Sequence, residues 1–185
     1  NPGKMLTIIG LSAQAVKEVC NKTGTEIANF NSPAQIVISG KVDGIEDASS
    51  LAKQYGAKKT LVLDVSGPFH SSLMDEASIL LKEYIEKISL SNARVPVISN
   101  FSAEPAVKPE IIKDNLINQV NHATRWEESV RYMIEQGVSR FIEIGPGNVL
   151  KGLIRKIIPQ AVVYNIENTN SMEDIKNNLK DICSG

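Results

Sequence analysis

The segment TLVLDVSGPFHSSLM, residues 60–74, joins an apolar run to a helix start and carries one of the two histidines of the chain. Residues 60–65 are typical of a strand, and Ser72-Leu73-Met74-Asp75 has the serine and acid spacing of a capping box. His70 is therefore expected just outside a helix N-terminus. The positive end of the helix dipole disfavours a protonated imidazole, which suits a general base. The alternative is a loop histidine that only satisfies backbone groups.

The sequence before this segment alternates between predicted strands and helices. We expect strands at residues 5–9, 25–30 and 35–40, a turn at 31–33, a helix that Ser12 caps and Gly24 ends, and a second helix at 42–55 that Gly56 closes. With the strand at 60–65 the order is β-α-β-β-α-β, the pattern of a ferredoxin-like split βαβ unit. We expect residues 1–65 to form this small α/β subdomain.

From residue 66 onward, helices alternate with short apolar strands. The expected helices are 72–88, 109–121, 126–136, 149–157 and 171–183, and the expected strands are 95–100, 140–144 and 161–165. Strands separated by helices favour parallel pairing. Three strands make a thin sheet, and the chain opens without an initiator methionine and runs almost at once into a strand. We therefore expect the remaining strands of this second region, 66–185, to lie upstream of Asn1.

Composition argues against several classes of protein. A net charge of −1 gives no electrostatic reason to expect a nucleic acid or an anionic membrane as partner. No apolar run approaches the roughly 18 residues that span a bilayer, and no secretory pattern is present, so we expect a soluble protein. Cys20 and Cys183 lie far apart, without zinc-ligand spacing, and are expected to be buried and reduced rather than part of a disulfide framework or a metal site.

Two loops have competing interpretations. The turn Gly145-Pro146-Gly147 between a strand and a helix can present backbone N–H groups to an anion, but it lacks G-x-G-x-x-G and the P-loop lysine, which favours a packing turn. Asn29 and Asn31 flank a strand end, where asparagine commonly serves a turn; contact with a substrate is the alternative.

A cluster of polar and aromatic residues occupies positions 119–126. His122 is expected to be a solvated loop residue, because nothing nearby offers a metal partner. Arg125 and Trp126 fit a stacked cation and ring, but Trp126 as the core anchor of a helix is the simpler interpretation. No G-x-S-x-G elbow occurs in the sequence, so His70 has no recognisable nucleophile in this chain.

Five ordered segments together resemble the malonyl-CoA:acyl carrier protein transacylase family of fatty acid synthesis. They are NFNSPAQIVISG at 29–40, GPFHSSLM at 67–74, VPVISN at 95–100, QVNHATRW at 119–126 and FIEIGPGNVL at 141–150. The resemblance covers essentially the whole chain. It implies a hydrolase-like α/β acyltransferase core interrupted by a ferredoxin-like subdomain, with residues 66–185 forming the C-terminal part of that core.

The resemblance also implies roles for individual residues. In this family a serine on a G-H-S-x-G elbow attacks the malonyl thioester, and the histidine matching His70 takes its proton. A main-chain carbonyl at the position of Gln119 orients the imidazole in place of a triad acid. Asn31 and Phe69 are expected to bind substrate. The elbow serine, the oxyanion-hole glutamine and the malonate-binding arginine belong to the upstream portion, so this chain supplies the base and lacks the nucleophile.

The expected partners are malonyl-CoA, an acyl carrier protein and the missing N-terminal segment, in the cytoplasm. No metal or redox cofactor is implied, since the coenzyme A thioester is the substrate. The acyltransferase domain of a polyketide synthase and a noncatalytic paralogue that binds carrier protein are the alternatives. An RNA-recognition module shares the β-α-β-β-α-β order, but residues 5–9 and 35–39 carry no aromatic side chain on which a base stacks.

Overall fold

The computed structural model describes the backbone of residues 3–183 and the side chains of residues 3–176. The chain forms two compact units, Asn1–Tyr132 and Met133–Gly185. The predicted subdomain boundary after residue 65 lies inside the first unit, and the separation of a small subdomain there stays a prediction.

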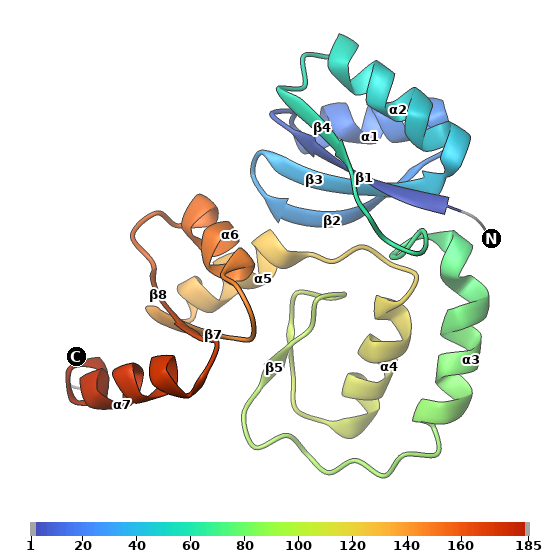
Figure 1. Cartoon of the computed structure of the whole chain (residues 1–185). Coiled ribbons are helices and arrows are strands. Elements are labelled where there is room, and N and C mark those ends of the chain that lie inside the picture. Colours follow the sequence, from blue (N-terminus) through green and yellow to red (C-terminus); the bar gives the residue numbers. More distant parts are fainter. Residues whose placement is uncertain (1–2, 184–185) are drawn as a thin grey trace. The chain divides into compact units, whose positions relative to one another are not determined.

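A four-stranded antiparallel sheet begins the first unit (Figure 1). Its strands are β1 (Gly3–Ile9), β2 (Glu26–Ser32), β3 (Gln35–Lys41) and β4 (Lys59–Val62), in the order β2-β3-β1-β4. Helices α1 (Ala13–Thr23) and α2 (Val42–Gln54) connect β1 to β2 and β3 to β4. The element order that the sequence predicts, β-α-β-β-α-β, is the order observed.

Helices α1 and α2 cover one face of this sheet (Figure 1). Alternate strand residues such as Leu6, Ile8 and Ile38 point to that face and pack with Val16 and Ile45 of the helices. Cys20 belongs to the same core, and burial raises the pKa of its thiol. Cys183 lies outside the residues whose side chains are described.

The limits of α1 follow the sequence signals. The Ser12 hydroxyl accepts the N–H of Ala15 at 3.2 Å, and Gly24 ends the helix with φ 62. A left-handed residue at this place favours glycine, which has no Cβ to clash with the backbone. The predicted cap and stop of this helix are confirmed.

The opposite face of the sheet supports the segment that carries His70. Met5, Ala28, Val37 and Leu63 pack on this face. At Gly3 an added Cβ would lie 2.6 Å from the Pro68 side chain, so the glycine permits a close approach of strand β1 and residue 68.

The capping box predicted at Ser72–Asp75 does not form. A 3₁₀ turn, η1 (Ser72–Met74), precedes helix α3 (Asp75–Ile85), which begins three residues later than predicted. The Ser72 hydroxyl donates to the Glu26 carboxylate at 2.5 Å instead of capping a helix. The hydroxyl that the local pattern predicts as a helix cap is therefore bonded to a carboxylate from a distant strand.

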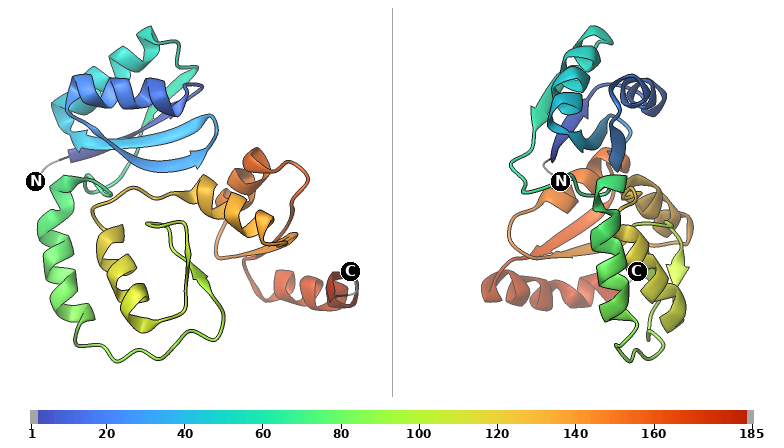
Figure 2. Two further views of the ribbon diagram at one scale, coloured as in Figure 1. Left: turned by 180° about the vertical axis from the view of Figure 1, so that it is seen from behind. Right: turned by 90° about the vertical axis from the view of Figure 1, so that its right-hand side faces the viewer.

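Helix α4 (Pro109–Gln119) runs beside α3 in the opposite direction (Figures 1 and 2). The two helices therefore bring the C-terminal end of α4 back to the start of α3. Helix α5 (Trp126–Glu135) follows after a short connection. This hairpin of helices makes residues near 70 and 119 neighbours.

The strand predicted at 95–100 is shorter than expected and pairs differently. Its hydrogen-bonded part, β5 (Val97–Ile98), pairs antiparallel with β6 (Pro105–Ala106), which the sequence analysis missed. The chain reverses between them because the Ser99 hydroxyl accepts the N–H groups of Phe101 and Ser102, and Ala103 takes φ 58. This local turn replaces the long crossover that parallel pairing would need.

The second unit contains a βαβ arrangement. Strands β7 (Arg140–Ile144) and β8 (Val162–Ile166) pair in parallel, as expected, and α6 (Val149–Ile157) connects them, followed by α7 (Thr169–Cys183). Leu153, Ile154 and Val163 are buried in this unit. Among the helices of the described residues, none combines the length and the apolar character of a membrane-spanning segment.

Candidate active site

His70 is held by a main-chain carbonyl. Its ring Nδ1 lies 2.8 Å from the carbonyl oxygen of Gln119. A carbonyl only accepts hydrogen bonds, so Nδ1 carries the proton of the neutral ring and donates it to this oxygen. The other nitrogen, Nε2, then keeps its lone pair. The ring is thus prepared to accept a proton at Nε2, as a general base requires.

The backbone of His70 adopts a conformation that is uncommon for a residue with a side chain. Its φ is 60, in the left-handed region. The His70 N–H donates to the carbonyl of Val120 at 3.1 Å, and the buried Ser71 hydroxyl donates to the carbonyl of Pro68 at 2.7 Å. Such strained residues persist only where their surroundings hold them, and they gather at functional sites.

Gln119 is itself tied to the small sheet through Thr124. Its side-chain Nε2 donates to the Thr124 hydroxyl at 3.0 Å. The Thr124 backbone pairs with β2, because its N–H donates to Ala28 O at 2.8 Å and its carbonyl accepts the N–H of Phe30 at 2.9 Å. The end of α4 is therefore anchored to the edge of the sheet. Among the described residues, Gln119 Oε1 is buried without a hydrogen-bond partner.

Phe69 and Asn31, the two predicted substrate contacts, differ in exposure. Phe69 is 37% exposed and directly precedes His70. Asn31 is half-buried and lies within β2, which continues to Ser32, so it is not the turn residue that the sequence suggested. Roles in substrate binding for Asn31 and Phe69, and in catalysis for His70 and Gln119, stay predictions.

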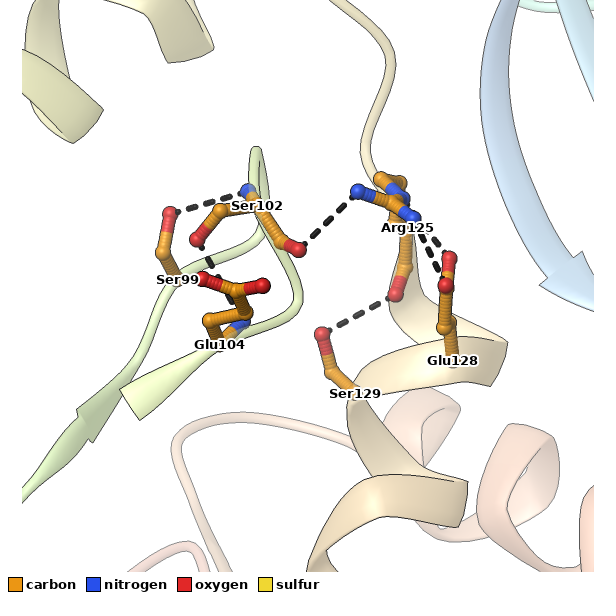
Figure 3. Close-up of polar contacts among 6 residues, drawn as sticks. All are labelled: Ser99, Ser102, Glu104, Arg125, Glu128 and Ser129. Atoms are coloured by element: carbon orange, nitrogen blue, oxygen red, sulfur yellow. Dashed lines mark hydrogen bonds and ion pairs between the residues drawn. The ribbon is translucent and has the colours of Figure 1, made fainter. Parts of the chain in front are cut away.

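Arg125 joins a loop to a helix (Figure 3). Its guanidinium contacts both carboxylate oxygens of Glu128 at 2.6 and 2.7 Å and donates from Nη1 to the carbonyl of Ser102 at 2.9 Å. These bonds, rather than a stack on Trp126, fix the guanidinium. The Trp126 indole N–H is buried without a partner among the described residues.

His122 is exposed and lies beside Phe101. The two rings meet edge to face with centroids 5.0 Å apart, and His122 Nδ1 lies 3.0 Å from the carbonyl of Asn118. In the part of the chain that the structure describes, no group of three or more histidine, cysteine or acidic residues is arranged to hold a metal ion.

The glycine turn after β7 is occupied by protein carboxylates. Glu143 accepts the N–H groups of Leu150 and Lys151 at 2.9 Å each, and Glu167 accepts the N–H of Gly147 at 3.2 Å. An anion at this turn would have to displace these carboxylates. The arrangement supports the packing turn over a phosphate cradle.

Sequence reasoning missed the residues that hold the His70 segment from a distance. Glu26 accepts hydrogen bonds from Ser72, 46 positions away, and Thr124 pairs with β2 while its hydroxyl accepts a bond from Gln119. No periodicity links residues so far apart, so neither contact leaves a local signal.

The comparisons with known proteins agree on one family. The acyl transferase domain model matches residues 1–183. The malonyl CoA-acyl carrier protein transacylase of Bacillus subtilis is 44% identical over 184 residues, which cover 97% of this chain and 58% of the relative. That of Staphylococcus aureus (strain COL) is 38% identical over 179 residues, 94% of this chain and 57% of the relative. The chain therefore spans somewhat over half the length of the curated relatives it matches.

Solved structures similar to this chain are malonyl transferases as well. A malonyl-transacylase in complex with its type II polyketide synthase acyl carrier protein has a TM-score of 0.93 at 34% identity, over 96% of this chain and 59% of that one. An acyl carrier protein S-malonyltransferase from Vibrio cholerae has a TM-score of 0.90 at 37% identity, over 95% of this chain and 58% of that one. The mixed α/β fold of the described residues is the fold of these enzymes over the matched part.

Proposed function

The chain belongs to the acyl transferase domain family, and on that premise we propose that the complete protein transfers a malonyl group from coenzyme A to an acyl carrier protein in fatty acid synthesis. The observation that carries the proposal is the hydrogen bond between His70 Nδ1 and the Gln119 carbonyl, 2.8 Å long, which leaves Nε2 as the proton acceptor.

The proposed reaction has two half-reactions. A serine from the upstream segment attacks the malonyl thioester while Nε2 of His70 takes the serine proton, and the same proton then goes to the departing coenzyme A thiolate. In the second half, the carrier-protein thiol gives its proton to Nε2 and attacks the malonyl-serine ester, and the serine recovers the proton as it leaves. The carbonyl of Gln119 holds the imidazolium that forms in both halves.

The proposal extends to the rest of the protein. We place a ferredoxin-like subdomain at residues 1–65 and the C-terminal part of a hydrolase-like core at 66–185, completed by an N-terminal segment that carries the serine. The length of the relatives supports this segment, since the chain covers 58% of the Bacillus subtilis protein. Asn31 and Phe69 would line the malonyl site. The reaction as proposed uses the coenzyme A thioester as substrate, needs no metal or redox cofactor, and would take place in the cytoplasm.

A second candidate function is transfer to a carrier protein of polyketide synthesis. The relative solved with a type II polyketide synthase carrier protein is 34% identical to this chain, and this likeness favours the candidate. Both candidates share the chemistry at His70 and differ in the carrier protein. Rates measured with one carrier protein of each kind distinguish them.

His70 is tested in the complete protein by His70→Ala. We expect turnover to fall by about two to four powers of ten, the usual worth of a positioned acid or base. His122→Ala, which removes the other histidine of this chain at an exposed position, is the matched control and should leave turnover nearly unchanged. A loss of less than tenfold in His70→Ala, with the circular dichroism spectrum intact, contradicts the assignment.

A further inference from the structure

Besides the bond from the ring to Gln119, several contacts hold residues 70–72, and one of them comes from strand β2, outside the loop and the helix pair. The His70 N–H bonds to Val120, and Ser71 bonds back to Pro68 within the loop. The third contact is the carboxylate of Glu26, on strand β2, which reaches Ser72. We infer that Glu26 is a positioning residue for the His70 ring. The inference rests on the proposed role of His70 as the base.

Glu26 makes a charge-assisted contact with both polar groups of Ser72. Its two oxygens accept the Ser72 backbone N–H at 3.2 Å each, and Oε1 also accepts the Ser72 hydroxyl at 2.5 Å. Hydrogen bonds to an ionised acceptor are shorter and stronger than neutral ones. The carboxylate thereby fixes the residue two positions after His70 to the small sheet.

The place of this contact explains why the loop needs it. Ser72 begins the 3₁₀ turn η1, where backbone N–H groups have no partner within the turn. Neither Ser71 before η1 nor Met74 before α3 caps with its own side chain. Glu26 supplies the capping oxygen from a strand 46 positions away, and a negative charge suits the N-terminal end of a helix.

The contact matters more for geometry than for stability. Glu26 and Ser72 are both exposed, and exposed polar pairs of this kind contribute little to the free energy of unfolding. The left-handed backbone of His70, at φ 60, instead depends on the residues on either side of it. When Ser72 is released, the His70 backbone gains freedom and its ring moves relative to the fixed carbonyl of Gln119.

The tautomer of the His70 ring reports this movement directly. In a neutral imidazole, the hydrogen bond made by one ring nitrogen decides which of the two nitrogens carries the proton. With the bond to Gln119 intact, the neutral ring is the Nδ1–H form. A loosened bond admits the Nε2–H form, whose Nε2 cannot accept a proton.

The test is two-bond ¹H–¹⁵N NMR of the complete protein at about pH 9, where an ordinary histidine is neutral. The signals of His70 and His122, the two histidines of residues 1–185, are assigned with His70→Ala and His122→Ala. We expect Glu26→Ala to raise the population of the Nε2–H tautomer of His70. Glu26→Gln keeps one acceptor oxygen and should retain mostly the Nδ1–H tautomer. Glu46→Ala, at an exposed position of α2, is the matched control and should change nothing.

An unchanged His70 tautomer in Glu26→Ala overturns the inference, and so does an equal change in Glu46→Ala. In the complete protein we expect Glu26→Ala to lower kcat about tenfold with little change in KM, as for a small misplacement of a reacting group. The NMR measurement uses no substrate. A protein that transfers no malonyl group but shows the tautomer change refutes the proposed function and leaves the positioning role standing.

Discussion

His70 adopts a left-handed backbone conformation, and Phe69 directly precedes it in the chain. A non-glycine residue in the left-handed region costs roughly 1–3 kcal/mol, which the bonds to Val120 and Gln119 help to offset. The Phe69 ring lies near Gly67, where an added Cβ would be 3.8 Å from the ring. The ring is 37% exposed, so it is available to a substrate beside the base.

We predict that Phe69 narrows the space beside the substrate α-carbon. Malonyl should then be preferred over methylmalonyl, and Phe69→Ser should relax the preference in the complete protein because the smaller side chain admits the extra methyl group. The measurement is the ratio of kcat/KM for the two coenzyme A esters. Phe69→Tyr keeps the ring and should keep the preference. If Phe69→Ser leaves the ratio as it was, another residue sets the selectivity.

At the scale of an element, the N-terminus of α6 depends on a side chain from the strand before it. Asn148 precedes the helix without a side-chain capping bond, and the carboxylate of Glu143 accepts the N–H groups of Leu150 and Lys151 instead. A negative charge at this end also interacts favourably with the helix dipole. Strand β7 and helix α6 are thus joined through one residue.

Glu143→Ala should therefore weaken the start of α6. The loss of an N-terminal cap costs about 1 kcal/mol, and hydrogen exchange at the amides of Leu150 and Lys151 should become faster as those groups lose their acceptor. Glu135→Ala, which removes an exposed carboxylate at the end of α5, is the control and should leave both amides protected. Equal exchange rates in Glu143→Ala and the unchanged chain would show that the carboxylate does not cap the helix.

At the scale of the whole molecule, large apolar side chains lie exposed in both units. Ile79, Leu80 and Tyr84 on α3 are 62%, 57% and 66% exposed, and Ile144 at the end of β7 is 79% exposed. On α3, Leu80 and Tyr84 are four positions apart and so lie on one side of the helix, and an exposed apolar helix face often marks a surface that meets another polypeptide. The proposed N-terminal segment is such a partner, and it would also supply the serine.

The 185-residue chain by itself should consequently form no malonyl ester, because a base without its nucleophile cannot form the covalent intermediate. Incubation with radiolabelled malonyl-CoA should leave the chain unlabelled, and addition of the upstream segment should restore one label per molecule on the elbow serine. Stoichiometric label on the chain alone, for instance at Ser71 or Ser72, would identify a nucleophile within it and refute the division of the site between two segments.

Several elements were predictable from the sequence because their signals are local. The cap at Ser12, the left-handed stop at Gly24, the bounds of β7 and of α6, and the β-α-β-β-α-β order all agree with the structure. Each depends on residues within a few positions, through hydrophobic periodicity, capping oxygens or the conformational freedom of glycine. The place of His70 after an apolar strand predicts its role as the base, and the family resemblance predicts the role of Gln119; both roles stay predictions.

Only the tertiary structure decided which partner each polar group takes. The local pattern predicts that the Ser72 hydroxyl caps a helix, but this hydroxyl donates to Glu26 of β2. Residues 97–98 pair antiparallel with the adjacent strand β6, whereas the sequence predicts a parallel partner. The carbonyl of Gln119 meets His70 across 49 positions because α4 returns antiparallel to α3. Such contacts form where the packing of distant elements leaves a donor beside an acceptor, and no pattern of neighbouring residues encodes that coincidence.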